Sequence, residues 1–307
     1  MSKKNGAIFV LTLSLVLIIF TGYLNFSADL KSVKSGSESV TETIKMEQLL
    51  TKETMEEIRS NDFVASLPKK PNFSFVENYD KSLDKRYITY FNKNKTLSGR
   101  EVVLKVNMNL DYPFYGLIEK TKNPFDLNVL CNKSHQLPSD FTPKNLVSVP
   151  KVYTINDGTQ YLLDAGALAS YINMSEAAKK DGIYLKIVSA YRSKEKQTAL
   201  YNKYSGKYGV TEADRFSARP RHSEHETGLA LDIYQTQQPF ENTKEFAWLE
   251  KNAYLYGFII RYPKGKEYLT GYMYEPWHYR YLGVEMTIDL QSSGLTYDEY
   301  YAINFSN

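Results

Sequence analysis

The chain has 307 residues, enough for one sizeable domain and smaller pieces, and its hydrophobic fraction of 42% is ordinary for a globular protein. The formal net charge is only +3, so the composition gives no reason to expect a nucleic-acid partner. The single cysteine, Cys131, excludes an internal disulfide framework and a cysteine-rich zinc knuckle, and any metal ion must therefore be held by His, Asp and Glu.

The start of the chain has the pattern of a targeting segment. Lys3 and Lys4 precede an apolar run over residues 7–20, which can extend further to about 20 residues, the length that spans a bilayer. The basic flank is expected to stay in the cytoplasm. We therefore expect residues 1–26 to be an uncleaved signal anchor that places the rest of the chain outside the membrane. A cleaved signal peptide is the alternative.

Two segments follow before the main domain. Residues 27–85 are polar and rich in Ser, Lys and Glu, and we interpret them as a stalk with one marginal helix over residues 42–59. Residues 86–125 should form a small, mainly helical subdomain, because Ser98 and Glu101 have the spacing of a capping box in front of an apolar run.

The main domain is predicted over residues 126–290, with residues 291–307 as a C-terminal tail. Apolar periodicity and capping residues predict two helices, over residues 164–180 and 243–256. Alternating patterns predict three strands, over residues 184–188, 228–234 and 279–282. This mixture predicts an α+β fold in which helices flank a small antiparallel sheet.

Two imidazoles and one carboxylate stand out near the end of the main domain. The alternation of the strand over residues 228–234 places Asp232 opposite its apolar face, and a buried carboxylate needs a partner. A turn before this strand can bring His225 beside Asp232, and Pro276 can bend the chain so that Glu275 and His278 reach the same cavity. Three protein ligands and a free position for water are the composition of a catalytic zinc site, and Glu275 has the place of a proton carrier.

Other interpretations of these residues stay open at this point. A trio of this kind also arises by chance, and Asp232 can simply cap a strand. His222 competes with His225 as a ligand, but in an extended segment the two side chains point apart, which favours a packing or rim role for His222. His135 lies in a polar stretch and is expected to be solvated.

Three motifs, in this order, resemble those of the VanY-type zinc D-alanyl-D-alanine carboxypeptidases. They are Ser189-Ala-Tyr-Arg-Ser193 with Gln197, then Ser223-x-His-x-x-Gly-x-Ala-x-Asp232, then Glu275-x-x-His278. The resemblance covers about residues 123–290. It implies a zinc D,D-peptidase/hedgehog-like fold, preceded here by the membrane anchor and the small helical segment.

The resemblance also implies the roles of the site residues. One Zn²⁺ per chain would be held by three side chains, those of His225, Asp232 and His278. Glu275 would be the catalytic base and acid. Arg192, also a catalytic residue by this resemblance, would hold the terminal carboxylate of the substrate or the developing oxyanion, together with Gln197 and Ser223.

The function implied in this way is that of a metallo-carboxypeptidase that removes the C-terminal D-Ala from peptidoglycan stem peptides. Its partners would be the stem peptide and, through the N-terminal anchor, the membrane, with no nucleic acid. The protein would be a single-pass cell-membrane protein with its catalytic domain on the cell-wall side. One departure concerns Arg221, which stands where members of the family often have Gly, and a long cation at the rim would alter substrate choice.

Three rival functions remain. An L,D-carboxypeptidase or an endopeptidase would share the same zinc scaffold. A serine peptidase would use a Ser-x-x-Lys pattern, found at Ser193–Lys196 and Ser66–Lys69, but the companion Lys-Thr-Gly is missing. A non-catalytic cell-wall binding module needs no proton carrier, so the presence of Glu275 argues against it.

Overall fold

The structure is a computed structural model that describes residues 71–305, apart from residue 156 and residues 234–238. The predicted signal anchor and the predicted helix over residues 42–59 lie outside the described residues. Within the described part, no helix has the length and apolar character needed to cross a membrane. The chain divides into two compact units, with the boundary between Val106 and Asn107.

The first unit, as far as it is described, is a small helical piece. It contains the short 3-10 helix η1 (Lys81–Leu83) and the helices α5 (Asp84–Lys93) and α6 (Gly99–Asn107). The capping box predicted in front of α6 is confirmed, since the Ser98 N–H donates to Glu101 Oε2 at 2.8 Å and the Glu101 N–H donates to Ser98 Oγ at 3.3 Å. Five buried side chains form its core: Phe73, Tyr87, Val102, Val103 and Val106.

The second unit is built on a four-stranded antiparallel sheet, which confirms the predicted small antiparallel sheet. The strand order is β5-β6-β8-β7. The strands are β5 (Ile187–Ser189), β6 (Ala230–Ile233), β7 (Phe258–Ile260) and β8 (His278–Tyr281). In the register of β6 and β8, Asp232 lies opposite His278. Two short strand pairs accompany the sheet: β1 (Glu119–Lys120) with β2 (His135–Gln136), and β3 (Leu146–Ser148) with β4 (Leu162–Asp164).

Both predicted helices of the main domain are confirmed. The first is α7, capped by Asp164, whose Oδ1 accepts from the Gly166 N–H at 2.8 Å. The second is α10 with η5, capped by Thr243 and ended by Gly257 in the left-handed conformation. The helices of this unit are α7 (Ala165–Lys180), α8 (Lys194–Tyr208), α9 (Val210–Ala213), α10 (Lys244–Asn252), α11 (Glu267–Thr270), α12 (Val284–Ser293) and α13 (Tyr297–Asn304). The 3-10 helices are η2 (Lys151–Tyr153), η3 (Glu224–Thr227), η4 (Phe240–Asn242) and η5 (Ala253–Tyr256).

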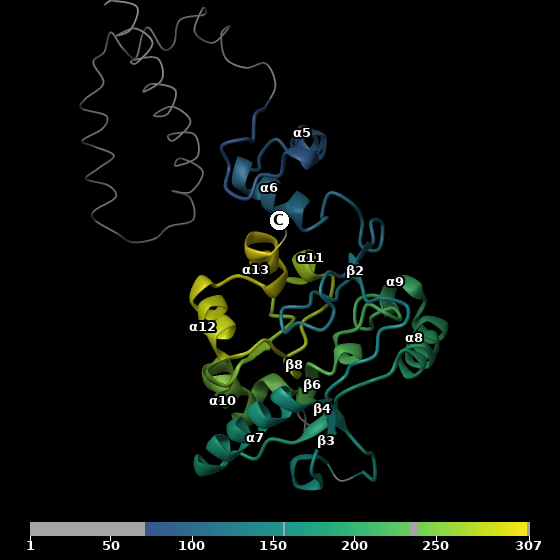
Figure 1. The fold of residues 1–307 in the computed structure, drawn as a ribbon, viewed down its shortest axis with the longest axis vertical. Helices are drawn as coiled ribbons and strands as arrows, with labels where there is room; N and C mark the ends of the chain where they lie inside the picture. The colour runs from purple at the N-terminus through teal and green to yellow at the C-terminus, as the bar shows by residue number, and fades with distance from the viewer. Residues whose placement is uncertain (1–70, 156, 234–238, 306–307) are drawn as a thin grey trace, which may run out of the picture. The chain divides into compact units, whose positions relative to one another are not determined.

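One face of the sheet carries the main core. Helices α7 and α10 lie together on the same side of β6 and β8 (Figure 1). Their apolar side chains pack against those of the strands, including Ile187, Leu231, Ile233, Phe258 and Tyr279. Because successive strand residues point to opposite faces, Asp232 and His278 belong to the other face. Because the strands pack one face against the core, the side chains of Asp232 and His278 point away from the core.

The end of the chain also packs into the second unit. Helix α13 lies within residues 291–307, the range assigned to a tail, and Thr296 and Glu299 form a capping box at its start. Tyr297, Tyr300 and Tyr301 belong to an apolar cluster with residues from elsewhere in the unit, among them Leu130, Ile259, Leu282 and Leu290. Hydrophobic contact with the sheet thus extends almost to the C-terminus.

Candidate metal centre and active site

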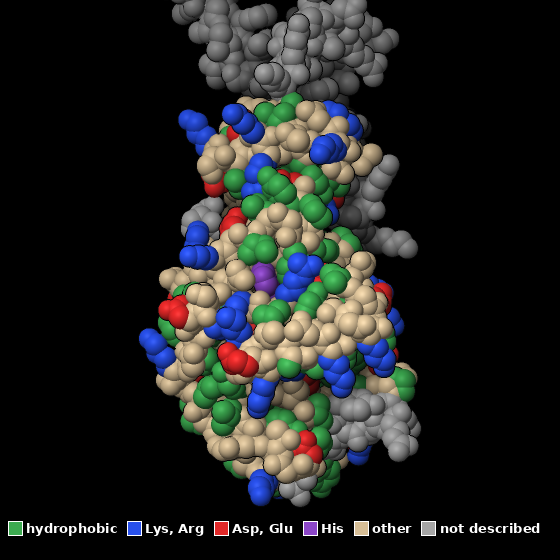
Figure 2. All heavy atoms as spheres, turned by 90° about the vertical axis from the view of Figure 1, so that its right-hand side faces the viewer, with side chains coloured by type: hydrophobic (Ala, Val, Ile, Leu, Met, Phe, Trp, Pro, Cys, Tyr) green, Lys and Arg blue, Asp and Glu red, His purple; other side chains and the backbone are tan. Residues whose placement is uncertain are grey.

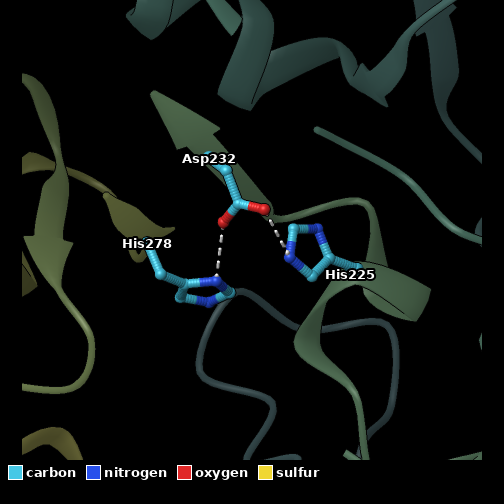
Figure 3. A group of neighbouring side chains, drawn as sticks. All are labelled: His225, Asp232 and His278. Atoms are coloured by element: carbon cyan, nitrogen blue, oxygen red, sulfur yellow. Dashed lines mark hydrogen bonds and ion pairs between the residues drawn. The ribbon is translucent and has the colours of Figure 1, made fainter. Parts of the chain in front are cut away.

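Three of the predicted site residues converge on one point (Figure 3). His225 comes from η3, Asp232 from β6 and His278 from the first position of β8. The ligand atoms of the three side chains lie within 4.8 Å of one another. Asp232 Oδ1 is 3.0 Å from His278 Nδ1, and Asp232 Oδ2 is 3.4 Å from His225 Nε2. The chain reverses between η3 and β6 at Gly228, which has a φ of 75°, and this reversal brings His225 beside Asp232.

The remaining ring nitrogens show that this cluster suits a metal ion. His225 Nδ1 lies 2.8 Å from the carbonyl oxygen of Ala190, so it carries the proton and leaves the lone pair of Nε2 facing Asp232. His278 Nε2 lies 3.6 Å from Glu224 Oε2, and neither atom has a hydrogen-bond partner among the described residues. Two imidazole nitrogens and one carboxylate are a donor set that zinc prefers.

The electrostatics of the cluster also fit a cation. Burial alone would raise the pKa of Asp232, but His225 and His278 outweigh it and hold this pKa well below its usual range. Burial would lower the pKa of His278, yet its contacts with Asp232 and Glu224 raise that pKa to about 9. A proton on His278 therefore balances the buried carboxylate, and a metal ion would replace that proton.

Glu275 lies beside the trio. Its Oε2 is 3.9 Å from His278 Nδ1, and the residue is only 7% exposed. Burial, with a further contribution from the charge of Asp232, raises the pKa of Glu275 to about 8. A carboxyl group that gains and loses a proton near neutral pH is suited to general acid–base catalysis.

A cavity of about 370 Å³ opens over the trio. Its lining brings together every predicted site residue, including Arg192, Gln197, Ser223 and Glu275. The Arg192 guanidinium donates to Gln197 Oε1 at 2.7 Å and to Ser189 Oγ at 3.0 Å, so part of its donor fork is already fixed in direction. The other walls are mainly apolar and aromatic: Leu200, Tyr204, Phe216, Met273 and Trp277.

The imidazoles of the site lie beneath the surface. His225 and His278 are 5% and 4% exposed. The face of the molecule drawn in Figure 2 shows a histidine side chain (purple) beside basic and hydrophobic side chains.

The structure also tests the sequence-based expectations for His222, His135 and Arg221. His222 is confirmed as a packing residue, since its Nδ1 lies 2.7 Å from the Asn132 carbonyl oxygen. The expectation that His135 is solvated was wrong, because this residue pairs in β2 and its side chain is 14% exposed. The expectation of a long cation at the rim was also wrong. Arg221 is 9% exposed and pairs with Glu226 at 3.3 Å.

The backbone explains why position 221 favours glycine. Arg221 has a φ of 73°, a left-handed conformation that glycine adopts without strain. One of the two Ser-x-x-Lys candidates, Ser193, has a structural role, while Ser66–Lys69 lies outside the described residues. Ser193 is the N-cap of α8, and its Oγ accepts from the Lys196 N–H at 3.3 Å.

Sequence reasoning missed two residues at the site. Glu224 is adjacent to His225 in the motif and is fully buried, and although burial would raise its pKa, Arg261 and Arg280 hold that pKa well below its usual range. Its position in the motif was a usable signal. Ser217 lines the cavity with a buried hydroxyl that has no partner in the described part of the chain, and its sequence context carried no signal.

Comparisons with known proteins agree on one family. A family model described as VanY, D-alanyl-D-alanine carboxypeptidase, matches residues 160–284. The Bacillus subtilis (strain 168) protein YodJ, named as a carboxypeptidase, is 38% identical over 192 residues, which are 60% of this chain and 70% of the relative. The solved structure of the LdcB LD-carboxypeptidase is 38% identical with a TM-score of 0.56, covering 60% of this chain and 89% of that one. The structure of VanYB in complex with D-Alanine-D-Alanine is 30% identical with a TM-score of 0.51, covering 58% of this chain and 98% of that one.

Proposed function

This chain belongs to the VanY family of D-alanyl-D-alanine carboxypeptidases and is a peptide hydrolase. From this premise we propose that it uses one zinc ion to remove the C-terminal D-Ala from peptidoglycan stem peptides that end in D-Ala-D-Ala. The observation that carries the proposal is the convergence of two imidazole nitrogens and a carboxylate beneath a cavity that Glu275 and Arg192 also line.

The zinc ion would be held by His225, Asp232 and His278. When bound, it would supply Lewis-acid chemistry, acidifying a water molecule and polarising the scissile carbonyl. Glu275, buried beside His278, would take a proton from the attacking water and return it to the leaving amine nitrogen. The low exposure of Glu275 keeps bulk water from competing for that proton.

The substrate would be oriented by its free terminal carboxylate. Arg192 can present two N–H groups to the two oxygens of a carboxylate, and its bonds to Gln197 and Ser189 hold it in place for this. Ser223 lines the same cavity. The apolar and aromatic walls would then accommodate the alanine methyl groups and exclude water.

An L,D-carboxypeptidase is the second candidate. The observation in its favour is the likeness to LdcB, which is higher in identity and TM-score than the likeness to VanYB. Both activities need the same metal site and the same carboxylate clamp. Incubation of the purified protein with muropeptides that carry pentapeptide or tetrapeptide stems, followed by mass analysis of the products, separates them. Loss of D-Ala from pentapeptides alone supports our proposal, and loss from tetrapeptides alone overturns its D,D specificity.

Removal of the metal is expected to abolish hydrolysis. A chelator should remove all measurable activity because the zinc ion would supply both the acidified water and the main polarisation of the carbonyl, and added zinc should restore it. A β-lactam should leave the activity unchanged, since it acts on a serine nucleophile. The measurement is D-Ala release in metal-free buffer before and after zinc addition. Activity that persists after chelation would contradict the mechanism.

We also propose that the second unit works on the cell-wall side of the membrane, with residues 1–26 as its anchor. The physical basis is the basic flank and the apolar run of about 20 residues. Protease added to intact protoplasts should digest the catalytic domain, while a cytoplasmic marker protein stays whole. A catalytic domain protected to the same degree as the marker would place it in the cytoplasm.

A further inference from the structure

We propose that Glu224 is a positioning residue for the metal site, which acts by accepting a hydrogen bond from His278 Nε2 and so presents His278 Nδ1 to the metal. The inference rests on the proposed zinc site. It concerns a residue outside the set of ligands and substrate-binding groups assigned above. Two buried polar atoms that face each other, Glu224 Oε2 and His278 Nε2, suggest this role.

The first step is the geometry at His278. Glu224 Oε2 lies 3.6 Å from His278 Nε2, and in the described part of the chain neither atom has a hydrogen-bond partner. The other ring nitrogen, Nδ1, faces Asp232, as Figure 3 shows. When a metal ion takes the lone pair of Nδ1, the ring proton must reside on Nε2. Glu224 Oε2 is then the acceptor for that proton, and a small ring movement closes the gap to hydrogen-bond length.

The second step is the anchoring of Glu224. Its other oxygen, Oε1, accepts from Arg261 Nε at 2.7 Å and from Arg280 Nη1 at 2.9 Å. The side chains of all three residues are 0% exposed. Arg261 in turn donates to both oxygens of Asp298 in α13, at 2.5 Å and 3.2 Å. One oxygen of Glu224 is therefore fixed by two cations, which leaves the second free to face His278.

The third step is the charge of this group. Two carboxylates, those of Glu224 and Asp298, stand against two guanidinium groups, those of Arg261 and Arg280. The network is thus balanced, which is needed because an unpaired ion in such a place is costly. The Tyr297 ring covers both guanidinium groups, with centroid distances of 5.3 Å and 5.4 Å. The site gains a strong acceptor without gaining net negative charge.

A neighbouring glutamate provides a matched comparison. Glu226 lies two residues further along the same 3-10 helix, η3, and is 1% exposed, as is Glu224. Its carboxylate accepts from the Arg221 N–H at 2.6 Å and from Arg221 Nη1 at 3.3 Å. None of these bonds reaches the histidines of the site. If both glutamates are purely structural, each contributes to folding stability and neither affects zinc binding. If Glu224 positions His278, only Glu224 also affects zinc binding.

The test compares Glu224→Gln with Glu226→Gln, using zinc alone as the probe. Zinc affinity of the metal-free proteins is measured by competition with a chromophoric chelator, and their folding by thermal unfolding. In Glu224→Gln the two arginines would hold the single remaining oxygen and leave the amide NH2, a donor, facing His278 Nε2. Loss of the acceptor behind a metal-bound histidine typically weakens metal binding ~10–100-fold. We expect that loss for Glu224→Gln and wild-type affinity for Glu226→Gln. Equal zinc affinity in both folded variants would overturn the inference. A wild-type protein that binds no zinc would instead refute the proposed function.

A second measurement needs no variant and so holds even if Glu224→Gln does not fold. Wild-type protein with ¹⁵N-labelled histidine, loaded with zinc, contains only four histidines to assign. We expect the His278 signal to show a proton on Nε2 and a metal-bound Nδ1. A proton on Nδ1, with the metal on Nε2, would overturn the role given to Glu224.

Discussion

Replacing Glu275 with glutamine is expected to lower turnover by at least ~10²–10⁴-fold, the usual contribution of a general acid–base group, while zinc stays bound. Glutamine has nearly the same shape but cannot take a proton from water or return one to the leaving amine. Since Glu275 Oε2 lies 3.9 Å from His278 Nδ1, beside the three ligands, the metal site itself should survive. Turnover on a D-Ala-D-Ala peptide and zinc content per chain are the two measurements.

Two further variants make this result specific. His278→Ala removes a ligand and should lose zinc as well as turnover. Glu226→Gln repeats the chemical change at a buried glutamate that pairs with Arg221, away from the trio, and should keep both. If Glu275→Gln loses as much zinc as His278→Ala, then Glu275 is a ligand and our assignment of the proton carrier is wrong.

Replacing Arg192 with alanine is expected to reduce cleavage of peptides that end in D-Ala-D-Ala by roughly 30-fold to several thousand-fold. This range corresponds to the cost of about 2–5 kcal/mol for removing one partner of a buried, hydrogen-bonded charge pair. Fold and zinc content should be unchanged, because Arg192 has no ion-pair partner among the described residues and its loss leaves no structural carboxylate unpaired. The measurement is kcat/KM on peptides with a free terminus.

An amidated peptide tests whether the carboxylate is the group that Arg192 recognises. Amidation should harm the wild type strongly and matter little to Arg192→Ala, because the variant has already lost the interaction. Arg219→Ala is the control, since Arg219 pairs with Asp214 at 2.8 Å and does not line the cavity. It should keep the preference for the free acid. Equal cleavage of acid and amide by the wild type would replace our proposal with an endopeptidase.

Short motifs and local periodicity were sufficient to identify much of this protein. Helix α7 followed from a capping aspartate and an apolar stripe, both of which act within one helix. The ligand trio could be predicted because the chain has only four histidines and because its motifs resemble those of the VanY-type family. The strand predicted over residues 184–188 forms only as Ile187–Ser189, because its extent depends on pairing with β6.

The tertiary structure alone decided what supports the site. Glu224 Oε1 is held by Arg261 and Arg280, which are 37 and 56 residues away in the sequence, so no local pattern could announce the contact. The left-handed backbone at Arg221 and the buried carboxylate of Glu226 set the direction of the Arg221 side chain. The length and charge of this side chain alone did not predict that direction. Likewise, α13 joins the core through tyrosines that meet Leu130 and Ile259 only after folding. Sequence by itself specifies which groups can do chemistry, whereas burial and pairing between distant segments decide where each one points and what holds it there.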